Sequence, residues 1–417
     1  MRYKITFPQI IDTTVDLPAS KSISNRALVI HALTGGRTLP ENLSDCDDTE
    51  VIIRALRDMP PVIDIKAAGT SMRFLTAYLS VTDSGEHIIT GTDRMLHRPI
   101  GILVDALRRL GADISYEGVE GYPPLHIRGR RLEGGYLEVP GNVSSQFISA
   151  LLMAGPAMLH GMELHLIGGI ISRPYIDLTL CMMRDFGANV EWTGPDTIQV
   201  LAQPYRATSY FIENDWSAAS YWYEILALSG QDSTVRLNGL TDGSRQGDSV
   251  ARYLFSLLGV KTTFGVTAKG VPTTITLRRH TTTLPRLEFS FINQPDLAQT
   301  YVVTCALLGI PFHFKGLSTL RIKETDRIDA LMIEMRKLGY VLTTNPDNDL
   351  IWSGERCEAE AAPVIDTYED HRMALAFAPA ASKFPGLRIN NPGVVTKSYP
   401  HYWDDLRRAG FQIEEEP

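Results

Sequence analysis

The sequence feature that most constrains the fold is a helix–glycine–strand segment that recurs five times along the chain. The copies read ALRRLGADI, MMRDFGANV, LFSLLGVKT, EMRKLGYVL and DLRRAGFQI, and their glycines are Gly111, Gly187, Gly259, Gly339 and Gly410. Successive glycines are 76, 72, 80 and 71 residues apart. Each stands where the end of a helix requires a left-handed residue, a conformation that glycine adopts without steric penalty. Alternating residues follow, so the pattern predicts units of roughly 75 residues made of helices and antiparallel strands.

A sixth copy begins early in the chain, at IIRALRDM, but it is cut short. The expected glycine and hairpin are missing, and the chain passes through Pro60–Pro61 directly to IDIKAAGT. Six units divide naturally into two groups of three, and the period is too long for the common solenoids. We therefore expect two α/β domains with internal pseudo-symmetry, an arrangement that often binds its ligand between domains. The alternative is that these segments are ordinary helix-to-strand connections of an α/β protein, which explains their near-equal spacing less well.

The composition excludes several classes of function. With 417 residues, 44% apolar and 21% charged, the chain is typical of a folded protein of about two domains. The net charge of −8 argues against a general basic surface for nucleic acid, so the cations for any anionic ligand have to be gathered locally. The sequence has no apolar run of membrane-spanning length, and MRYKITFPQI lacks the apolar stretch of a signal peptide. We expect a cytoplasmic protein with no membrane partner.

The cysteines and histidines give no metal-binding pattern. Cys46, Cys181, Cys305 and Cys357 are far apart and form no CxxC pair, and the ten histidines form no HExxH or HxxxH motif. A disulfide framework is not expected in a chain of this length. The sequence therefore predicts no metal site.

Three predicted helices of the first half begin with clustered hydroxyl groups. They start in PASKSISNRALVI, GNVSSQFISALLM and SRPYIDLTL, at Ser20, Ser144 and Ser172. Backbone N–H groups, hydroxyls and a nearby lysine such as Lys21 suit the binding of an anion at a helix N-terminus. The alternative is an ordinary N-cap, for which one serine suffices. A fourth helix opens at Gly69, where a ligand can approach the backbone closely.

The second half of the chain supplies charged groups at predicted helix starts. RIKETDRIDAL places Lys323, Glu324 and Arg327 at the N-terminal end of a helix, where cations oppose the helix dipole. Asp296 precedes another long apolar helix, as a simple cap or as a general base. Arg372 precedes a third apolar helix in TYEDHRMAL, and Lys397 lies in a loop before the last helix; both are candidate ligand contacts.

These motifs together resemble the EPSP synthase family. KSISNR, GTSMR, RPIGILVDAL, SSQF, SRPYIDLTL, RIKETDR, EDHRMAL and TKSYPHYW occur in the family's order and at compatible spacing, over residues 15–410. The resemblance implies an α/β (α+β) fold, a two-domain inside-out α/β barrel in which each domain has three βαβαββ repeats with helices inside, the first repeat here being truncated. It places one domain at 20–213 and the other at 1–19 plus 214–417, with the active site in the cleft between them.

The resemblance also implies the activity: transfer of the enolpyruvyl group of phosphoenolpyruvate to the 5-hydroxyl of shikimate 3-phosphate, in chorismate and aromatic amino acid biosynthesis. It implies a monomer without metal or cofactor. It assigns shikimate 3-phosphate to Lys21, Ser22, Arg26, Ser144, Ser145, Gln146, Ser172, Tyr175, Asp296 and Lys323. It assigns phosphoenolpyruvate to Lys21, Gly69, Arg98, Gln146, Arg327, Arg372 and Lys397.

The implied mechanism is addition followed by elimination, with Lys21, Asp296 and Glu324 as the catalytic residues. Asp296 accepts the proton of the sugar hydroxyl, whose oxygen attacks C2 of phosphoenolpyruvate, while Glu324 delivers a proton to C3. Phosphate then leaves and a proton is lost from C3. Two carboxylates can divide acid and base work in this way when their environments separate their pKa values.

The chain departs from the family pattern at three places. It reads Lys66–Ala67–Ala68 where the family usually has GNA before Gly-Thr, so one polar contact to phosphoenolpyruvate is in doubt. The segment from Lys21 to Gly69 is shorter than usual, which is consistent with the loss of a surface hairpin. Thr319 stands where some members have an asparagine at the shikimate ring.

The motifs have two rival interpretations. UDP-N-acetylglucosamine enolpyruvyl transferase shares the fold and the donor, but it typically has a cysteine shortly before the Arg-Pro, and here that loop reads GTDRMLHRPI. The other is a non-catalytic binding paralogue, against which the retention of Lys21, Asp296 and Glu324 counts. The resemblance further implies that glyphosate competes with phosphoenolpyruvate beside Gly69, although Phe74, where many members have proline or an aliphatic residue, leaves the sensitivity open.

Overall fold

The five repeat glycines end their helices in the left-handed conformation, as the sequence predicts. Gly111, Gly187, Gly259, Gly339 and Gly410 have φ angles of 105°, 81°, 90°, 82° and 99°. At Gly339 a Cβ atom would also lie 2.9 Å from the carbonyl oxygen of Cys357. Glycine is therefore required there by both backbone conformation and space.

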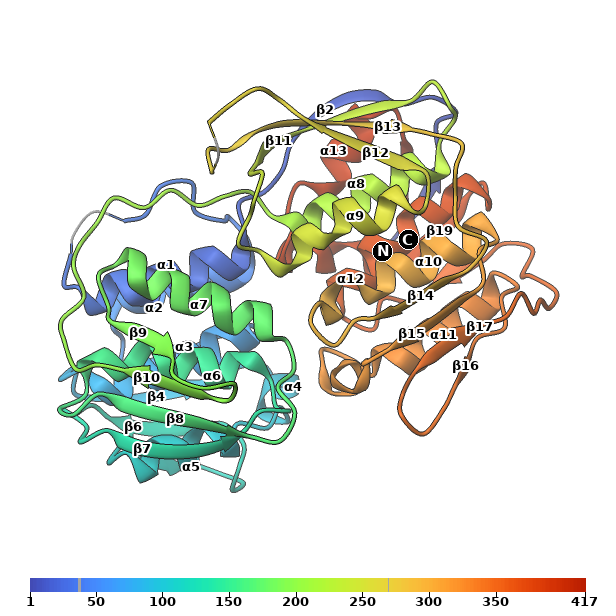
Figure 1. Cartoon of the computed structure of the whole chain (residues 1–417). Helices are drawn as coiled ribbons and strands as arrows, with labels where there is room; N and C mark the ends of the chain where they lie inside the picture. The colour runs from blue at the N-terminus through green and yellow to red at the C-terminus, as the bar shows by residue number, and fades with distance from the viewer. Residues whose placement is uncertain (37–38, 269) are drawn as a thin grey trace. The chain divides into compact units, whose positions relative to one another are not determined.

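The computed structural model describes residues 1–36, 39–268 and 270–417. By its internal contacts the chain divides into two units: unit 1 combines Met1–Pro18 with Glu213–Pro417, and unit 2 is Ala19–Ile212 (Figure 1). Unit 2 is thus inserted, in sequence, between two segments of unit 1.

The described residues form five four-stranded sheets with one shared topology. In each sheet two strands pair in parallel, and two further strands add antiparallel on one side, as in the order β3-β4-β6-β5. A helix lies between the two parallel strands and another between the second strand and the hairpin, which gives the predicted βαβαββ repeat. The predicted mixed α/β repeat architecture is therefore confirmed.

Unit 2 contains the first three repeats. The first consists of helices α1 (Lys21–Leu33) and α2 (Asp47–Asp58). The second consists of β3 (Val62–Asp64), α3 (Gly69–Val81), β4 (Glu86–Thr90), α4 (Asp93–Leu96), α5 (Gly101–Arg109), β5 (Asp113–Tyr116) and β6 (Leu125–Arg128). The third consists of β7 (Gly135–Pro140), α6 (Ser145–Ala154), the 3-10 turn η1 (Gly155–Ala157), β8 (Met162–Ile167), α7 (Arg173–Asp185), β9 (Val190–Trp192) and β10 (Thr197–Val200).

Unit 1 contains the other three repeats. The fourth consists of β2 (Asp12–Asp16), α8 (Trp216–Leu228), β11 (Thr234–Leu240), η2 (Gly247–Val250), α9 (Ala251–Ser256), β12 (Val260–Phe264) and β13 (Thr273–Arg279). The fifth consists of β14 (Leu287–Ser290), η3 (Pro295–Leu297), α10 (Ala298–Leu308), β15 (Phe312–Lys315), η4 (Ser318–Ile322), α11 (Arg327–Lys337), β16 (Thr343–Thr344) and β17 (Leu350–Trp352). The sixth consists of β18 (Val364–Ile365), α12 (His371–Phe377), η5 (Ala378–Ser382), β19 (Leu387–Asn390), η6 (Pro392–Lys397), α13 (Tyr402–Arg408), β20 (Gln412–Glu416) and β1 (Arg2–Thr6).

The first repeat is truncated, as the sequence predicts. Met59 ends α2 in the left-handed conformation with φ 40°, at the place that glycine takes in the other repeats. No hairpin follows it in the described part of the chain, because the next strand, β3, already belongs to the sheet of the second repeat. A single parallel bridge, Glu41–Phe211, joins two extended segments of this region.

The N-terminal segment of the chain completes two sheets of unit 1. Strand β1 lies between β19 and β20, antiparallel to both, and β2 pairs in parallel with β11. The two ends of the chain therefore lie side by side in one sheet (Figure 1).

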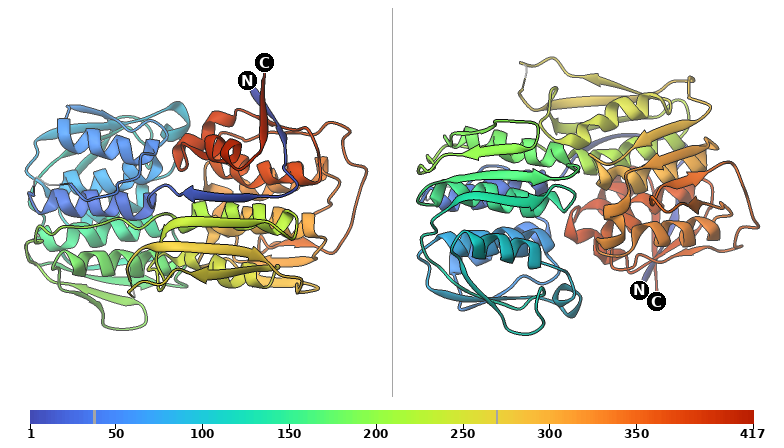
Figure 2. Two further views of the ribbon diagram at one scale, coloured as in Figure 1. Left: turned by 90° about the horizontal axis from the view of Figure 1, so that it is seen from above. Right: turned by 60° about the horizontal axis from the view of Figure 1, so that its bottom comes forward.

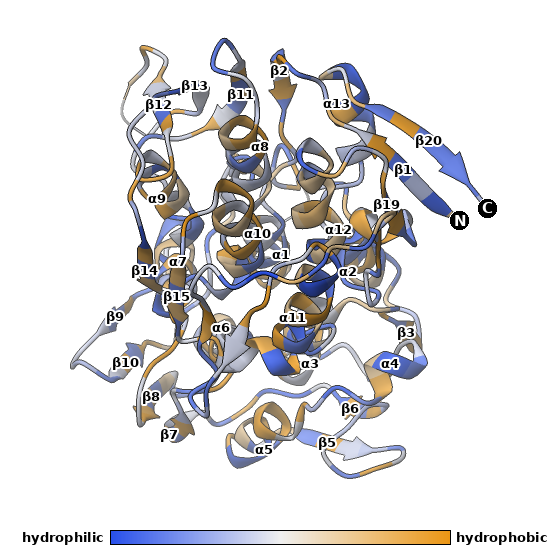
Figure 3. Ribbon diagram, turned by 90° about the vertical axis from the view of Figure 1, so that its right-hand side faces the viewer, coloured by the Kyte–Doolittle hydropathy of each residue, from blue (hydrophilic) through white to orange (hydrophobic). Residues whose placement is uncertain are grey.

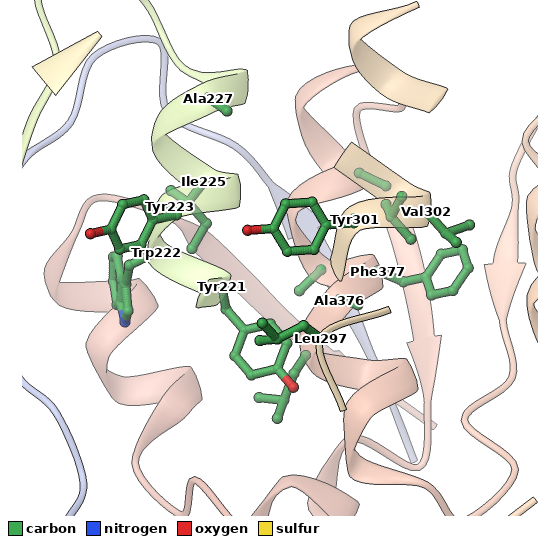
Figure 4. Packing of buried hydrophobic residues seen from close by; sticks show 14 of the residues in the cluster. Tyr221, Trp222, Tyr223, Ile225, Ala227, Leu297, Tyr301, Val302, Ala376 and Phe377 are labelled. Carbon is green, nitrogen blue, oxygen red and sulfur yellow. The ribbon is translucent and has the colours of Figure 1, made fainter. Parts of the chain in front are cut away.

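The helices form the interior of each unit. In α8, α10 and α12 almost every residue is buried, and in α3 only Tyr78 is not. Figure 2 shows the helices within each unit running beside one another with strands on the outside, and Figure 3 shows the predominantly hydrophobic colouring of α8, α10 and α12. In Figure 4 side chains of α8, α10 and α12 interlock, with Tyr223, Tyr301 and Phe377 among them. A helix buried on all sides requires this apolar composition.

Three further findings bear on the functional class. The helices described include none that is long and apolar enough to cross a membrane. The thiols of Cys46, Cys181, Cys305 and Cys357 are free. Over residues 1–36, 39–268 and 270–417, no group of three or more His, Cys, Asp or Glu side chains is arranged to hold a metal ion.

Candidate active site

The charged residues predicted in the second half of the chain come together in unit 1. The unit 1 cluster joins the N-terminal ends of α10, α11 and α12 and the end of η6. Its members are Asp296, Lys323, Glu324, Arg327, Asp370, Arg372 and Lys397.

Arg327 is the centre of the unit 1 cluster. Its side chain is 1% exposed, and its Nε lies 2.6 Å from Asp370 Oδ2. Its Nη2 lies 2.9 Å from Glu324 Oε2, and its Nη1 lies 3.3 Å from Asp296 Oδ1. Despite its burial, these carboxylates raise the pKa of Arg327 above its ordinary value. The guanidinium is therefore a fixed positive charge that holds three helix starts together.

Asp296 is an ionised carboxylate surrounded by cations. Arg372 Nη2 lies 2.9 Å from its Oδ2, and Lys323 Nζ lies 3.4 Å from its Oδ1. Burial alone would raise the pKa of Asp296, but the charges of Arg372, Lys323 and Arg327 outweigh it and hold that pKa well below the usual value. The structure does not show Asp296 as a helix cap, because α10 begins without a side-chain cap. The simple-cap alternative is therefore wrong.

Glu324 is held by two cations at once. Lys397 Nζ lies 2.7 Å from its Oε1, while Arg327 takes its Oε2. Burial lowers the pKa of the neighbouring Lys323, and the negative charge of Asp296 only partly offsets this effect. Both predicted acid–base residues thus lie within reach of one set of Lys and Arg side chains.

Unit 2 gathers helix N-termini in a similar way. Lys21 Nζ at the start of α1 lies 3.3 Å from Asp48 Oδ2 at the start of α2. Ser71 Oγ, at the start of α3, donates to the Asp48 carbonyl oxygen at 2.8 Å. Gln146 Nε2, at the start of α6, donates to Thr70 Oγ1 at 3.1 Å. Four positive ends of helix dipoles are therefore tied to one another, which favours an anion at this place.

Arg26 is a deeply buried predicted ligand contact of unit 2. Its Nε donates to Thr179 Oγ1 at 2.7 Å, its Nη1 to the Ser22 carbonyl oxygen at 2.8 Å and its Nη2 to Ser149 Oγ at 3.1 Å. Burial lowers its pKa to about 10, and nearby Tyr175 only partly offsets this effect. A cation whose hydrogen bonds go to uncharged groups would be stabilised by an added anion.

Gly69 lies against two arginines. A Cβ atom at this position would meet Nη1 of Arg98 and would lie 2.6 Å from Nη1 of Arg73. Arg73 Nη1 also donates to the Gly69 carbonyl oxygen at 2.6 Å. The predicted pair Gly69 and Arg98 is thus brought together, and glycine is required because both guanidinium groups approach it.

The hydroxyl-bearing helix starts differ in detail from one another. Ser144 caps α6 by accepting from the Gln146 N–H at 3.4 Å, so the ordinary-cap interpretation holds for this serine. Ser145 is the first residue of the helix and Ser144 alone caps it. Ser172 precedes α7 in the left-handed conformation, φ 53°, and its side chain caps nothing. Ser145 and Ser172 therefore keep hydroxyls that the helix itself does not use.

Sequence reasoning missed several residues of both clusters. Asp48, Asp370 and Tyr221 were not assigned to the site, although Asp48 holds Lys21 and Asp370 holds Arg327. Arg372 Nη1 donates to Tyr221 Oη at 3.2 Å, and burial raises the pKa of Tyr221 to about 12. Figure 4 shows the ring of Tyr221, a residue of α8, beside Leu297. The signal was present only for Asp48 and Asp370, whose positions at helix starts match those of the assigned residues.

Comparison with solved structures defines the class of fold. EPSP synthase from Acinetobacter baumannii superposes with a TM-score of 0.79 at 22% identity, covering 99% of this chain and 100% of that one. The enolpyruvyl transferase NikO from Streptomyces tendae superposes with a TM-score of 0.73 at 17% identity, covering 99% and 98%. The fold is that of the enolpyruvyl transferases.

Sequence comparison then gives the family. The model described as EPSP synthase (3-phosphoshikimate 1-carboxyvinyltransferase) matches residues 5–61 and 59–406. A 3-phosphoshikimate 1-carboxyvinyltransferase from Bacteroides fragilis is 58% identical over 414 residues, 99% of each chain. That of Pseudoalteromonas atlantica is 35% identical over 436 residues, covering 95% of this chain and 96% of its own. The chain belongs to the EPSP synthase family and has its 3-phosphoshikimate 1-carboxyvinyltransferase activity, a step of aromatic amino acid biosynthesis.

Proposed function

We propose that unit 2 holds shikimate 3-phosphate and that unit 1 carries the acid and the base of the transfer reaction. The observation that carries this proposal is the placement of Asp296 and Glu324 among Lys323, Arg327, Arg372 and Lys397. Cations in this number suit phosphoenolpyruvate, which has a carboxylate and a phosphate, and the paired carboxylates suit proton transfer.

Phosphoenolpyruvate binding would change the proton affinity of both carboxylates. In the structure, Arg327, Arg372 and Lys397 pair with Asp296 and Glu324. A bound phosphoenolpyruvate would compete with these carboxylates for the same N–H donors. Lys21, Gly69, Arg98 and Gln146 are the other residues proposed to hold it. As the ligand's negative charge neutralises the cations, the carboxylates lose part of their stabilisation and hold a proton more readily. The donor would thereby prepare its own acid and base.

Shikimate 3-phosphate would bind at the joined helix starts of unit 2. The residues proposed to hold it are Lys21, Ser22, Arg26, Ser144, Ser145, Gln146, Ser172 and Tyr175, with Asp296 and Lys323 from unit 1. The converging helix dipoles and the hydroxyls of Ser145 and Ser172 support this assignment. Thr319 Oγ1, which is buried and has no hydrogen-bond partner among the described residues, is a further donor for the sugar ring.

The reaction then proceeds by addition and elimination. Asp296 takes the proton of the 5-hydroxyl as its oxygen bonds to C2, and Glu324 protonates C3, so that the C2–C3 double bond becomes single. In the second step the C2–O bond to phosphate breaks, C3 loses a proton and the double bond forms again. Lys21 and the arginines stabilise the charge on the departing phosphate.

The test is release of inorganic phosphate from phosphoenolpyruvate, with Asp296→Asn and Glu324→Gln beside the unchanged enzyme. Release that requires shikimate 3-phosphate, continues with chelator present and falls in both variants supports the assignment. UDP-N-acetylglucosamine serves as the control acceptor and should give no release. Variants with unchanged turnover would overturn the acid–base roles, and an unchanged enzyme that binds both substrates without releasing phosphate would indicate the binding paralogue.

A further inference from the structure

The turn that precedes α12 has an unfavourable backbone conformation at two successive residues. Tyr368 and Glu369 have φ angles of 52° and 56°, the left-handed region that residues other than glycine rarely adopt. Such residues persist only where the surrounding structure holds them, and they concentrate at functional sites. The segment 366–370 therefore requires contacts that keep it in place.

One buried carboxylate supplies these contacts. Glu334 of α11 has a side chain that is 0% exposed. Its Oε1 accepts from Tyr368 Oη at 2.6 Å, and its Oε2 accepts from the Asp366 N–H at 3.2 Å. Lys337 Nζ lies 2.8 Å from Glu334 Oε2 and 2.9 Å from Asp366 Oδ2. Glu334 thus binds the turn at its first residue and at its strained residue.

The same turn presents two members of the unit 1 cluster. Asp370 ends it, accepts from the Arg372 N–H at 3.0 Å and binds Arg327 Nε at 2.6 Å. Helix α11 carries both Arg327 and Glu334, so it holds the turn on both sides of the strained residues. A shift of this turn would move Asp370 and Arg372 together, and with them the ion pair between Arg372 and Asp296.

We propose that Tyr368 and Glu334 are positioning residues for phosphoenolpyruvate, because they hold the strained turn that places the Arg372 guanidinium. The inference rests on the assignment of Arg372 to phosphoenolpyruvate made above. Neither Tyr368 nor Glu334 is itself a member of the unit 1 cluster. Their hydrogen bond acts on the donor substrate through the backbone of residues 366–370.

The decisive variant is Tyr368→Phe, which removes only the hydroxyl. The KM for phosphoenolpyruvate should rise about tenfold, since small displacements of a binding group weaken its contacts strongly, while the KM for shikimate 3-phosphate stays within about twofold. Tyr136→Phe is the matched control, because Tyr136 Oη donates to Glu138 Oε1 at 2.7 Å on the exposed face of β7 in unit 2. It should leave both constants unchanged.

A second variant separates positioning from general stabilisation. Asparagine adopts the left-handed conformation more readily than glutamate, so Glu369→Asn should reduce the effect of Tyr368→Phe when the two are combined. A lowered Tm with an unchanged KM for phosphoenolpyruvate, or equal changes in the KM of both substrates, would overturn the inference. So would the same Tyr368→Phe effect with and without Glu369→Asn.

Arg372→Lys, measured in parallel, separates this inference from the proposed function. If Arg372→Lys leaves the KM for phosphoenolpyruvate unchanged, the assignment of Arg372 fails and the inference fails with it. If Arg372→Lys raises that KM and Tyr368→Phe does not, only the positioning role is overturned.

Discussion

Arg26 of unit 2 and the cations of the unit 1 cluster are held by different kinds of partner. In unit 1 the cations Arg327, Arg372 and Lys397 pair with carboxylates, whereas in unit 2 Arg26 is hydrogen-bonded to two hydroxyls and a carbonyl oxygen. A carboxylate that loses its paired cation can bind a proton instead, whereas a hydroxyl group does not change its protonation state near neutral pH. On the proposed assignment, this difference suits unit 1 to proton transfer and Arg26 to holding an anion that does not change during the reaction.

The largest effect is expected from Asp296→Asn. The kcat should fall by about a thousandfold, because the amide cannot accept the proton of the hydroxyl. Substrate binding should be equal or tighter, since Arg372 and Lys323 lose a competing negative charge. Steady-state kinetics and equilibrium binding of shikimate 3-phosphate measure the two quantities.

The control for Asp296→Asn is Asp12→Asn on β2, where Asp12 lies 2.7 Å from Arg236 on the surface. Its kinetics should match those of the unchanged enzyme. A parallel loss of kcat and of binding in Asp296→Asn would contradict the division between the two clusters.

The second effect concerns unit 2. Arg26→Lys keeps the charge but cannot satisfy Thr179, the Ser22 carbonyl and Ser149 together. The KM for shikimate 3-phosphate should rise by about 10- to 100-fold, with kcat reduced less than threefold. Arg57→Lys, at an exposed pair with Asp58, is the control. An equal rise in the KM for phosphoenolpyruvate would show that Arg26 is not specific to the acceptor.

The third effect concerns the space beside Gly69. A methyl group there displaces the guanidinium ends of Arg98 and Arg73, so Gly69→Ala should raise the inhibition constant of glyphosate by about tenfold. Inhibition kinetics against phosphoenolpyruvate measure it, and Gly393→Ala, where a Cβ atom meets nothing within 4 Å, is the control. An unchanged constant would remove Gly69 from the proposed pocket.

The smallest effect concerns a carboxylate of unit 1 whose ionisation is set by burial rather than by paired cations. Glu224 of α8 is completely buried, and burial raises its pKa well above the usual value, an effect that Thr304 only partly offsets. A raised folded-state pKa stabilises the fold below the unfolded pKa, and this stability is lost as pH rises through the folded pKa. Glu224→Gln should therefore be more stable than the unchanged enzyme at alkaline pH, by about 1–3 kcal/mol.

Thermal unfolding at several pH values measures the Glu224 effect. The difference in Tm between Glu224→Gln and the unchanged enzyme should grow as the pH rises above the pKa of Glu224 in the unfolded chain. Glu288→Gln is the control, because Glu288 is an exposed residue of β14 whose Oε1 lies 2.9 Å from Arg286 Nε. A difference in Tm that does not depend on pH would show that Glu224 is not a neutral acid in the folded protein.

The parts of the fold that follow from local sequence could be predicted. A glycine after an amphipathic stretch fixes a helix end, so Gly111, Gly187 and Gly339 mark their repeats without reference to the rest of the chain. Helix starts at Lys21 and Gly69 are equally local. The absence of a glycine after α2 indicated the truncated repeat, but that Met59 itself takes the left-handed conformation could not be predicted, because methionine carries no such preference.

The site was predictable in its members but not in its pairings. Arg327 and Arg372 were recognisable because their motifs are specific, yet nothing in the sequence relates Arg372 to Tyr221, 151 residues away. The contact between Tyr368 and Glu334 likewise depends on how α11 packs against the last repeat. Contacts between distant segments arise from tertiary packing, which local patterns do not encode.

The position of β1 has a consequence for how the chain folds during synthesis. The ribosome makes Arg2–Thr6 long before both strands that flank it, β19 and β20. Unit 2 is continuous from Ala19 to Ile212 and can acquire its structure while translation continues, whereas unit 1 has to wait for its final strand. The nascent chain thus carries Arg2–Thr6 as an unpaired strand until β19 and β20 have been made, and this segment is where chaperone binding would protect the chain.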